Sequence, residues 1–495
     1  MKRILSLFLS ALMLMTAAVF TLTSCNEEEP VEEVGGKQDL PSVGMQEGDI
    51  FAERAEVADG LGEYDFGGRK LRLVSHNKDD FFVEEEDRNK GNLIADAKFN
   101  RNKTVEDRFN FEMEVVYTGS YGEVNEWASK NILAGADEFD LYSSQTMAAG
   151  GLVLKNVFLN WYDIPNVDFT KPWWASSNAD ELTYDGKCIL AISDFNYSAI
   201  SGTFCMAFNK NLASAYDMGN LYEVVKNGDW TYDYFYNLIK DVYTDTDGSG
   251  DKSLGDFYGF EQDHWWGTYI GCWLWAFDNP VADKNEDGVP VVAIKTDKIN
   301  NIVTTLYDLC YNTKGCYYAN NSEKQKNSIF FERRAIFTVA TIGSPTSEQF
   351  RNFEDEYGIL PLPKWNENQQ DYHTMAPGEH NCLAVPKTCT DTEFVGTCIE
   401  ALSAESYKQV IPTLYEIALK TRYLRDSESK EVLDVVLEGR TYDFGYIYDN
   451  WKGFGFMLSD IIGTGSSNFE SYYAERYTMA KNHFKKITKV FDKLG

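Results

Sequence analysis

The sequence has few histidines and lacks the motifs of common catalytic and metal centres. Five histidines are scattered along 495 residues, and there is no CxxC pair, HExxH helix or G-x-S-x-G turn. Basic residues are also scarce, with 46 Lys and Arg against 77 Asp and Glu and a formal charge of −31. Nucleic acids and other polyanions need a basic surface, so this balance argues against them as partners.

Long apolar runs are absent except at the start of the chain. Lys2 and Arg3 precede an apolar stretch from Ile4 to Phe20, which is too short and too one-sidedly flanked for a spanning helix. Leu22-Thr23-Ser24-Cys25 then follows and resembles the bacterial lipobox. We therefore expect a signal peptide over 1–24, lipid attachment at Cys25, and a mature protein held on the outer side of the cell membrane; an ordinary cleaved signal is the alternative.

The residues after Cys25 are poor in large apolar side chains. Residues 25–62 contain Glu27-Glu28-Glu29, Glu32-Glu33 and several glycines. A segment of this composition buries too little surface to offset its chain entropy, so we expect a disordered acidic tether. About 430 residues remain, which is enough for two lobes.

Eight cysteines lie beyond Cys25, none with zinc-like spacing. Several stand in apolar surroundings, as in Phe204-Cys205-Met206, which favours buried free thiols; a bridge between Cys310 and Cys316 is the alternative. Aromatic residues are abundant, with 11 Trp and 30 Tyr. An excess of Trp and Tyr in an exported protein suits a groove that stacks on sugar rings.

The body alternates between strand and helix patterns. Strands are expected at 70–75, 111–117, 139–142, 189–192, 203–208, 335–340, 357–361 and 382–386. Helices are expected at 92–109, 127–134, 232–242, 392–402, 406–419 and 468–494. Alternation of this kind implies right-handed crossovers and mostly parallel sheets, so the fold class is α/β.

In this order the segments resemble the extracellular solute-binding proteins of ABC transporters, the family-1, largely carbohydrate-binding group. The resemblance covers nearly all of the mature body and is carried by short segments of moderate specificity: the strand end Phe139-Asp140-Leu141-Tyr142, the strand and turn Phe204 to Leu212, the helix start Asp229-Trp230-Thr231, the strand Ala335 to Ser344, and Gly358-Ile-Leu-Pro361. It implies a two-lobed periplasmic-binding-protein-like fold (type II) with discontinuous lobes joined by hinge segments. The first lobe would take 66–155 and 372–424, and the second 156–371 and 425–495.

Ligands of such sheets bind beyond the carboxyl ends of the strands. The polar residues at those ends are our candidate contacts: His76, Asn77, Ser143, Ser144, Gln145, Asp194, Thr203 and Gly343. Trp265, Trp266 and Trp451 are the candidate stacking residues, with at most one of the adjacent pair facing a cleft, whereas Trp273 and Trp275 suit the core.

One acidic segment has the spacing of a twelve-residue calcium loop. Its candidate ligands are Asp245, Asp247, Ser249, Asp251 and Asp256, with Gly250 at the sixth position. Ser at position five and Asp at position twelve depart from the common pattern, although Asp at twelve resembles the dockerin-type loop. We expect a weak structural calcium site and no required cofactor; an acidic turn is the alternative. The segment Asp283 to Gly288 lacks the final carboxylate and is expected to be a hairpin turn.

These features favour a monomeric, non-enzymatic binding protein that captures a solute, an oligosaccharide by resemblance, and delivers it to ABC permease subunits. Two alternatives stay open on the sequence alone. One is an exported carbohydrate-active hydrolase, because carboxylates are plentiful. The other is a surface glycan-capture protein without a transporter.

Overall fold

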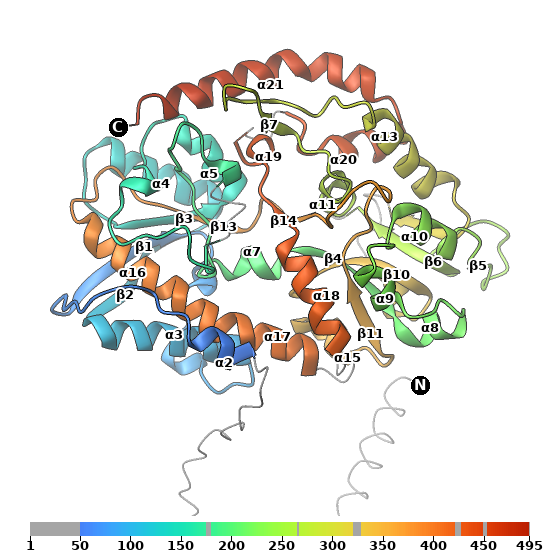
Figure 1. The fold of residues 1–495 in the computed structure, drawn as a ribbon, viewed down its shortest axis with the longest axis horizontal. Helices are drawn as coiled ribbons and strands as arrows, with labels where there is room; N and C mark the ends of the chain where they lie inside the picture. The colour runs from blue at the N-terminus through green and yellow to red at the C-terminus, as the bar shows by residue number, and fades with distance from the viewer. Residues whose placement is uncertain are drawn as a thin grey trace, which may run out of the picture. The chain divides into compact units, whose positions relative to one another are not determined.

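The computed structural model describes residues 50–495 except 175–179, 265–266, 320–327, 421–426, 449–452 and 495. Residues 50–495 form one compact unit by their contacts, and Figure 1 shows two β-sheets in it with the short helix α7 (Tyr197–Ser201) between them. Among the helices of the described residues, none is long and apolar enough to cross a bilayer.

The first sheet has the order β13-β3-β1-β2. Its strands are β1 (Arg69–Ser75), β2 (Phe111–Thr118), β3 (Leu141–Gln145) and β13 (Asn381–Ala384). β1 pairs in parallel with both β2 and β3, whereas β13 runs antiparallel to β3. The crossover helices are α3 (Leu93–Phe109) and α4 (Tyr121–Leu133), and α5 (Thr146–Val153) follows β3 directly.

The second sheet has the order β11-β4-β10-β6-β5, with β9 also paired to β6. Its strands are β4 (Phe204–Asn209), β5 (Tyr243–Thr244), β6 (Phe257–Asp263), β9 (Cys316–Ala319), β10 (Ala335–Thr341) and β11 (Tyr357–Leu360). β10 and β9 are parallel to β6, but β4 is antiparallel to β10 and β11, so this sheet is mixed.

Shorter elements surround the second sheet. They are α8 (Lys210–Ala215), α9 (Leu221–Lys226), α10 (Tyr232–Ile239), α11 (Thr268–Gly271), α12 (Trp273–Ala276), α13 (Ile299–Tyr307), η5 (Asp308–Asn312), α14 (Ser328–Phe331), η6 (Ser344–Thr346) and α15 (Glu348–Asn352). The hairpin expected near Asp283 is confirmed, as β7 (Ala282–Lys284) pairs antiparallel with β8 (Pro290–Val292).

The chain passes between the sheets at three places. The first passage includes α7, the second β12 (Thr374–Met375), and the third β14 (Arg440–Thr441). β12 and β14 pair in parallel, and the Thr374 hydroxyl donates to the Phe204 carbonyl at 2.8 Å. These short links connect the two sheets.

The C-terminal part is helical. It contains α16 (Thr392–Glu405), η7 (Ser406–Val410), α17 (Ile411–Lys420), α18 (Ser427–Glu438), α19 (Phe444–Tyr448), α20 (Met457–Ile462) and α21 (Phe469–Phe491). α21 packs on α13, α19, α20 and β8, and it runs along the top edge of Figure 1.

Most of the expected elements are confirmed, and the differences have local causes. The helix expected at 127–134 begins at Tyr121, because Ser120 and Glu123 form a reciprocal capping box. The strand expected at 189–192 is wrong. Ala191 makes only an isolated bridge with Leu383, because Ser193 and Asn196 exchange hydrogen bonds that turn the chain.

A structured segment overlaps the expected tether. Residues 50–62, assigned to it above, include α2 (Ile50–Ala55) and a segment held on the body. Asp59 is 9 % exposed and pairs with Arg108, and Val57 and Leu61 pack against the core around β1. Residues 1–49 lie outside the described part, and the remaining lobe boundaries stay predictions.

Candidate functional site

Two adjoining hollows lie where segments of the two sheets approach each other. One, of about 350 Å³, is lined mainly by the residues after β10 together with Ser201 and Gly202. The other, of about 830 Å³, is lined by residues 78–98 after β1 and by Thr346 and Arg351. Both include Tyr197 and Thr346, so we treat them as one groove, whose size suits a ligand of several rings.

A buried carboxylate holds together the segments beside this groove. Asp80 follows β1 and accepts hydrogen bonds from Ser198, from the backbone N–H at 2.7 Å and from the hydroxyl at 2.6 Å. It also accepts from the Asn381 amide at 2.8 Å. These three bonds tie the segment after β1 to α7 and β13, and thus hold Tyr197 in place.

An ammonium–aromatic contact forms the next part of the groove. Lys98 Nζ lies 4.1 Å from the centre of the Tyr197 ring and donates to the Asp79 carbonyl at 2.9 Å. Burial lowers the pKa of Lys98 to about 8. Tyr197 and Lys98 thus line the groove as a contacting pair, with the ammonium over the ring face.

The second sheet contributes hydroxyl groups. The Ser344 hydroxyl accepts from the Thr341 N–H at 2.9 Å, and the Thr346 hydroxyl donates to the Gly343 carbonyl at 2.7 Å. These bonds use only part of the hydrogen-bonding capacity of each hydroxyl. Gln349 and Ser347 line the same hollow beside Phe331 and Phe350, so this wall combines polar groups with aromatic rings.

The predicted residues fall at different depths around the groove. Gly343 lines it, and its N–H donates to the Ser201 carbonyl at 2.7 Å. His76 is half-buried and Asn77 exposed, immediately before the groove residue Lys78. Burial lowers the pKa of His76, and its Nδ1 atom has no hydrogen-bond partner among the described residues.

Other predicted contacts are deeper. Ser143 and Ser144 are fully buried in β3, and Gln145 precedes α5. Thr203 is also fully buried, and its hydroxyl donates to the Ala199 carbonyl at 3.0 Å. The ligand contacts assigned to these residues stay predictions.

Asp194 lies elsewhere. It lines a separate hollow with Arg54 and Arg440, whereas Gly343 lines the groove. The structure therefore does not bring Asp194 together with Gly343.

The stacking candidates Trp265, Trp266 and Trp451 lie outside the described residues, as does Cys25. Trp273 and Trp275 belong to the core, as expected, at 0 % and 3 % exposure. All eight cysteines beyond Cys25 are buried free thiols.

Sequence reasoning missed Tyr197, Thr346 and Lys98. Tyr197 follows a segment that was assigned to a strand, and Lys98 sits within a helix pattern that offers no local sign of a site. The run of hydroxyl residues after Gly343 was the available signal, but the candidate contacts stopped at Gly343.

The calcium candidates are partly brought together. Carboxylate oxygens of Asp245, Asp247 and Asp256 lie within 4.8 Å of one another. Asp245 accepts from the N–H groups of Gly248 and Gly250, and the Ser253 hydroxyl donates to Asp247 at 2.6 Å, which helps to lower the pKa of Asp247 to about 2. Ser249 donates to the Asp251 carbonyl, and the carboxylate of Asp251 is not among the three.

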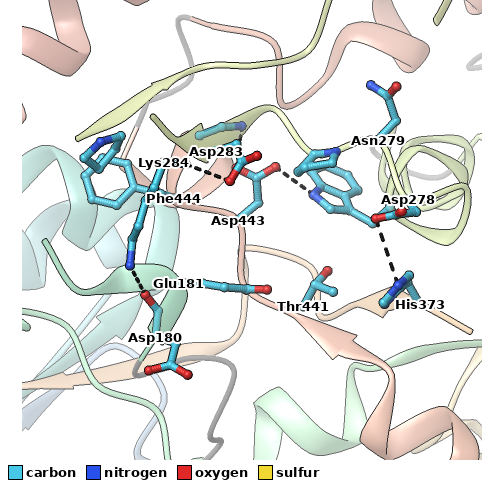
Figure 2. Close-up of a pocket in the computed structure, with 14 residues that line it drawn as sticks. Asp180, Glu181, Asp278, Asn279, Asp283, Lys284, His373, Thr441, Asp443 and Phe444 are labelled. Atoms are coloured by element: carbon cyan, nitrogen blue, oxygen red, sulfur yellow. Dashed lines mark hydrogen bonds and ion pairs between the residues drawn. The ribbon is translucent and has the colours of Figure 1, made fainter. Parts of the chain in front are cut away.

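Another hollow, of about 340 Å³, lies beside β7, β8 and β14 (Figure 2). Its central carboxylate, Asp443, accepts from Trp275 Nε1 at 2.9 Å and from the N–H of Gly445 at 2.7 Å. Figure 2 also shows Lys284 pointing to the Asp180 carbonyl. Asp443 and Lys284 are thus already paired within the protein.

Comparison with known proteins supports the fold. No family model and no curated protein matches the sequence. Among solved structures, the galacto-N-biose/lacto-N-biose I-binding protein of the Bifidobacterium longum ABC transporter, in complex with lacto-N-biose, is similar with a TM-score of 0.57 and 14 % identity, over 86 % of this chain and 98 % of that one.

Two further structures are similar over most of the chain. An ABC transporter solute-binding protein from Thermotoga lettingae, bound with alpha-D-tagatose, has a TM-score of 0.51 and 12 % identity, over 85 % of this chain and 100 % of that one. A cyclo/maltodextrin-binding protein complexed with maltotetraose has a TM-score of 0.51 and 13 % identity, over 88 % and 99 %. The fold is thus the two-lobed one of periplasmic-type solute-binding proteins.

Proposed function

We propose that this protein captures an oligosaccharide outside the cytoplasm, as a lipid-anchored binding protein, and delivers it to an ABC permease. The observation that carries the proposal is the groove at the strand ends. The part after β10 offers hydroxyls, the Gln349 amide and aromatic rings, and the part after β1 offers charged groups such as Asp79 and Lys98 together with the Phe82 ring. Sugars offer the matching surface, with hydroxyls at the edges and apolar ring faces.

The solved structures agree with this choice. The three proteins described above bind sugars, as their names state. At 12–14 % identity they support the fold, so the ligand class rests on the groove itself.

Capture follows from contacts on both sides of the groove. One side of the groove offers Asp79 and Lys98, and the other offers Gln349 and Ser344. A sugar that contacts both sides makes all its hydrogen bonds only when the two sides approach each other. The ligand therefore favours the closed arrangement through its differential affinity. The short hinge links, β12, β14 and the segment with α7, allow that approach without breaking either sheet. No bond of the ligand is broken.

A calorimetric screen of mono- and oligosaccharides, with nucleosides and dipeptides as controls, tests the ligand class. For the sugar that the screen identifies, Gln349→Ala and Asp79→Ala should each raise the dissociation constant by about two- to twelve-fold. This factor corresponds to the loss of one hydrogen bond. Glu367→Gln, an exposed change outside the groove, is the matched control and should bind normally. Unchanged affinity in both groove variants would show that the sugar binds elsewhere. Hydrolysis of the sugar by the native protein would favour the hydrolase.

A further inference from the structure

The C-terminal helix α21 carries a concentration of lysines on its exposed side. Between Arg476 and its end at Phe491 the helix contains neither Asp nor Glu. The exposed lysines of this segment and of the residues just after it, which we call the α21 lysine face, are Lys481, Lys485, Lys486, Lys489 and Lys493. In a chain with a formal charge of −31, such a cluster of one basic residue type indicates an interaction surface.

Packing of the helix fixes the direction of these lysines. The rings of Phe491 and Tyr448 lie 5.8 Å apart, between ring centres, and the buried side chains of this half of the helix include Ala480, His483, Phe484, Ile487 and Val490. Lys481, Lys485 and Lys489 are spaced four residues apart on the other side, so they form one row. This row is exposed, and Figure 1 shows α21 along the outer edge of the view.

The described part of the protein does not neutralise these lysines. Lys481 Nζ lies 5.6 Å from the centre of the Tyr477 ring, and none of the five forms an ion pair or a side-chain hydrogen bond with a residue that the structure describes. Arg476 of the same helix, by contrast, pairs with Asp460 at 3.5 Å. Asp492 is the only acidic residue beyond Arg476. The charge of the α21 lysine face is therefore available to a partner outside the chain.

Helix stability does not account for this row of lysines. Cations stabilise the C-terminal end of a helix, but the effect is confined to the last turn. Lys489 is the only basic residue in the last turn of α21, whereas Lys481, Lys485 and Lys486 lie earlier in the helix. Like charges four residues apart on one face are slightly destabilising. The row therefore has a small cost in the isolated protein, and an anionic partner would remove that cost.

The residue types of this face favour a lipid surface over an acidic protein. Specific protein interfaces are depleted in lysine and enriched in arginine and large aromatic residues. The α21 lysine face contains only lysine, and the apolar side chain beside it is Met479, which is 42 % exposed. Helices with lysines and an exposed apolar side chain are typical of proteins that lie on anionic headgroups. Lysines suit such a surface because each is a separate, flexible point charge.

We propose that the α21 lysine face docks this protein on a bilayer surface that contains anionic phospholipids, with the helix lying parallel to that surface. The attraction is local, because charges more than about 8 Å from the headgroups are largely screened at physiological salt. The acidic remainder of the chain therefore does not cancel it. This docking is separate from a lipid on Cys25 and from the sugar groove, so it holds whether or not the proposed ligand class is correct.

Vesicle flotation tests this surface with the mature chain carrying Cys25→Ala, so that no attached lipid contributes. The chain should bind vesicles of phosphatidylcholine with about one third phosphatidylglycerol, and it should not bind vesicles of phosphatidylcholine alone. Raising the salt concentration from about 0.05 M to about 0.5 M should release it. Absence of binding to the anionic vesicles at low salt would overturn the proposal, as would equal binding to both kinds of vesicle.

Variants locate the binding on α21. Lys481→Gln, Lys485→Gln and Lys489→Gln, combined in one chain, should lower the partition coefficient on anionic vesicles at least about ten-fold. The same three residues changed to Arg keep their charges, and this variant should bind as the native chain does. A matched triple change to Gln removes the same net charge from exposed lysines elsewhere and should also bind normally; its positions are Lys103, Lys130 and Lys314. Unchanged melting temperatures would show that all three variants are folded. An equal loss of binding in the matched variant, or no loss in the α21 Gln variant, would contradict the proposal.

Discussion

The Asp80 carboxylate binds Ser198 twice, through its backbone N–H at 2.7 Å and its hydroxyl at 2.6 Å. Asp80 follows the first strand of one sheet, and Ser198 lies in the helix that leads to the other. This pair therefore joins the loop after β1 to the first passage between the sheets, and the Asn381 amide adds a bond from the start of β13.

Asp80→Ala should destabilise the fold. It leaves the Ser198 hydroxyl, the Ser198 N–H and the Asn381 amide without their acceptor in a site where Asp80 is only 3 % exposed. We expect a loss of about 2–4 kcal/mol in the free energy of unfolding. Urea denaturation measures it, with the exposed neighbour variant Asp79→Ala as control. An equally small change in the free energy of unfolding of both variants would show that the hydrogen bonds to Asp80 contribute little.

Asp194 should make stability depend on pH. Burial raises its pKa to about 7 from the ordinary 3.8, so the folded protein holds a proton that the unfolded chain releases. The stability of the native protein should therefore fall as pH rises from about 4 to about 7. Asp194→Asn removes this penalty and should raise the melting temperature at pH 8, with a smaller gain at pH 5.5. A variant that melts below the native protein at pH 8 would contradict this reasoning.

The calcium loop stays a prediction with a direct test. Asp245 and Asp247 are exposed, and their oxygens lie near that of buried Asp256. Calcium should raise the melting temperature of the native protein, and Asp247→Asn should abolish this increase. Thermal unfolding with calcium and with a chelator compares the two states. Identical curves for the native protein would leave the loop as an acidic turn.

The lipid anchor is tested at Cys25. Because a lipid on this cysteine would be the only hold on the membrane that resists high salt, Cys25→Ala should move the protein from the membrane fraction to the medium or periplasm. Fractionation after a high-salt wash measures the distribution. A variant that sediments with membranes as the native protein does would refute the lipobox interpretation.

Much of the fold could be predicted because its signals are local. The alternation at Phe111 to Tyr117 and the apolar run at Ala335 to Ala340 each specify a strand without help from distant residues. The predicted elements that were wrong or too short involve side chains that redirect the backbone. Ser193 and Asn196 turn a segment whose apolar residues are typical of a strand, and the Ser120–Glu123 capping box extends a helix beyond its apolar pattern.

The site was harder to predict, because its residues meet only through the hinge passages. Gly343 was found at the end of its strand, but Lys98 reaches Tyr197 from a helix that shows no sign of a ligand in its own sequence. Asp194 looked like a strand-end contact, yet the turn at Ser193 directs it to the opposite side of α7. Strand ends thus indicated the region but not the direction of each side chain.

The position of α7 has a thermodynamic consequence. One helix of five residues is the shared wall of the groove and of the hollow that contains Asp194. A substitution on the hollow's side of this helix, such as Ile200→Ala, can therefore change ligand affinity in the groove without altering a residue that lines the groove.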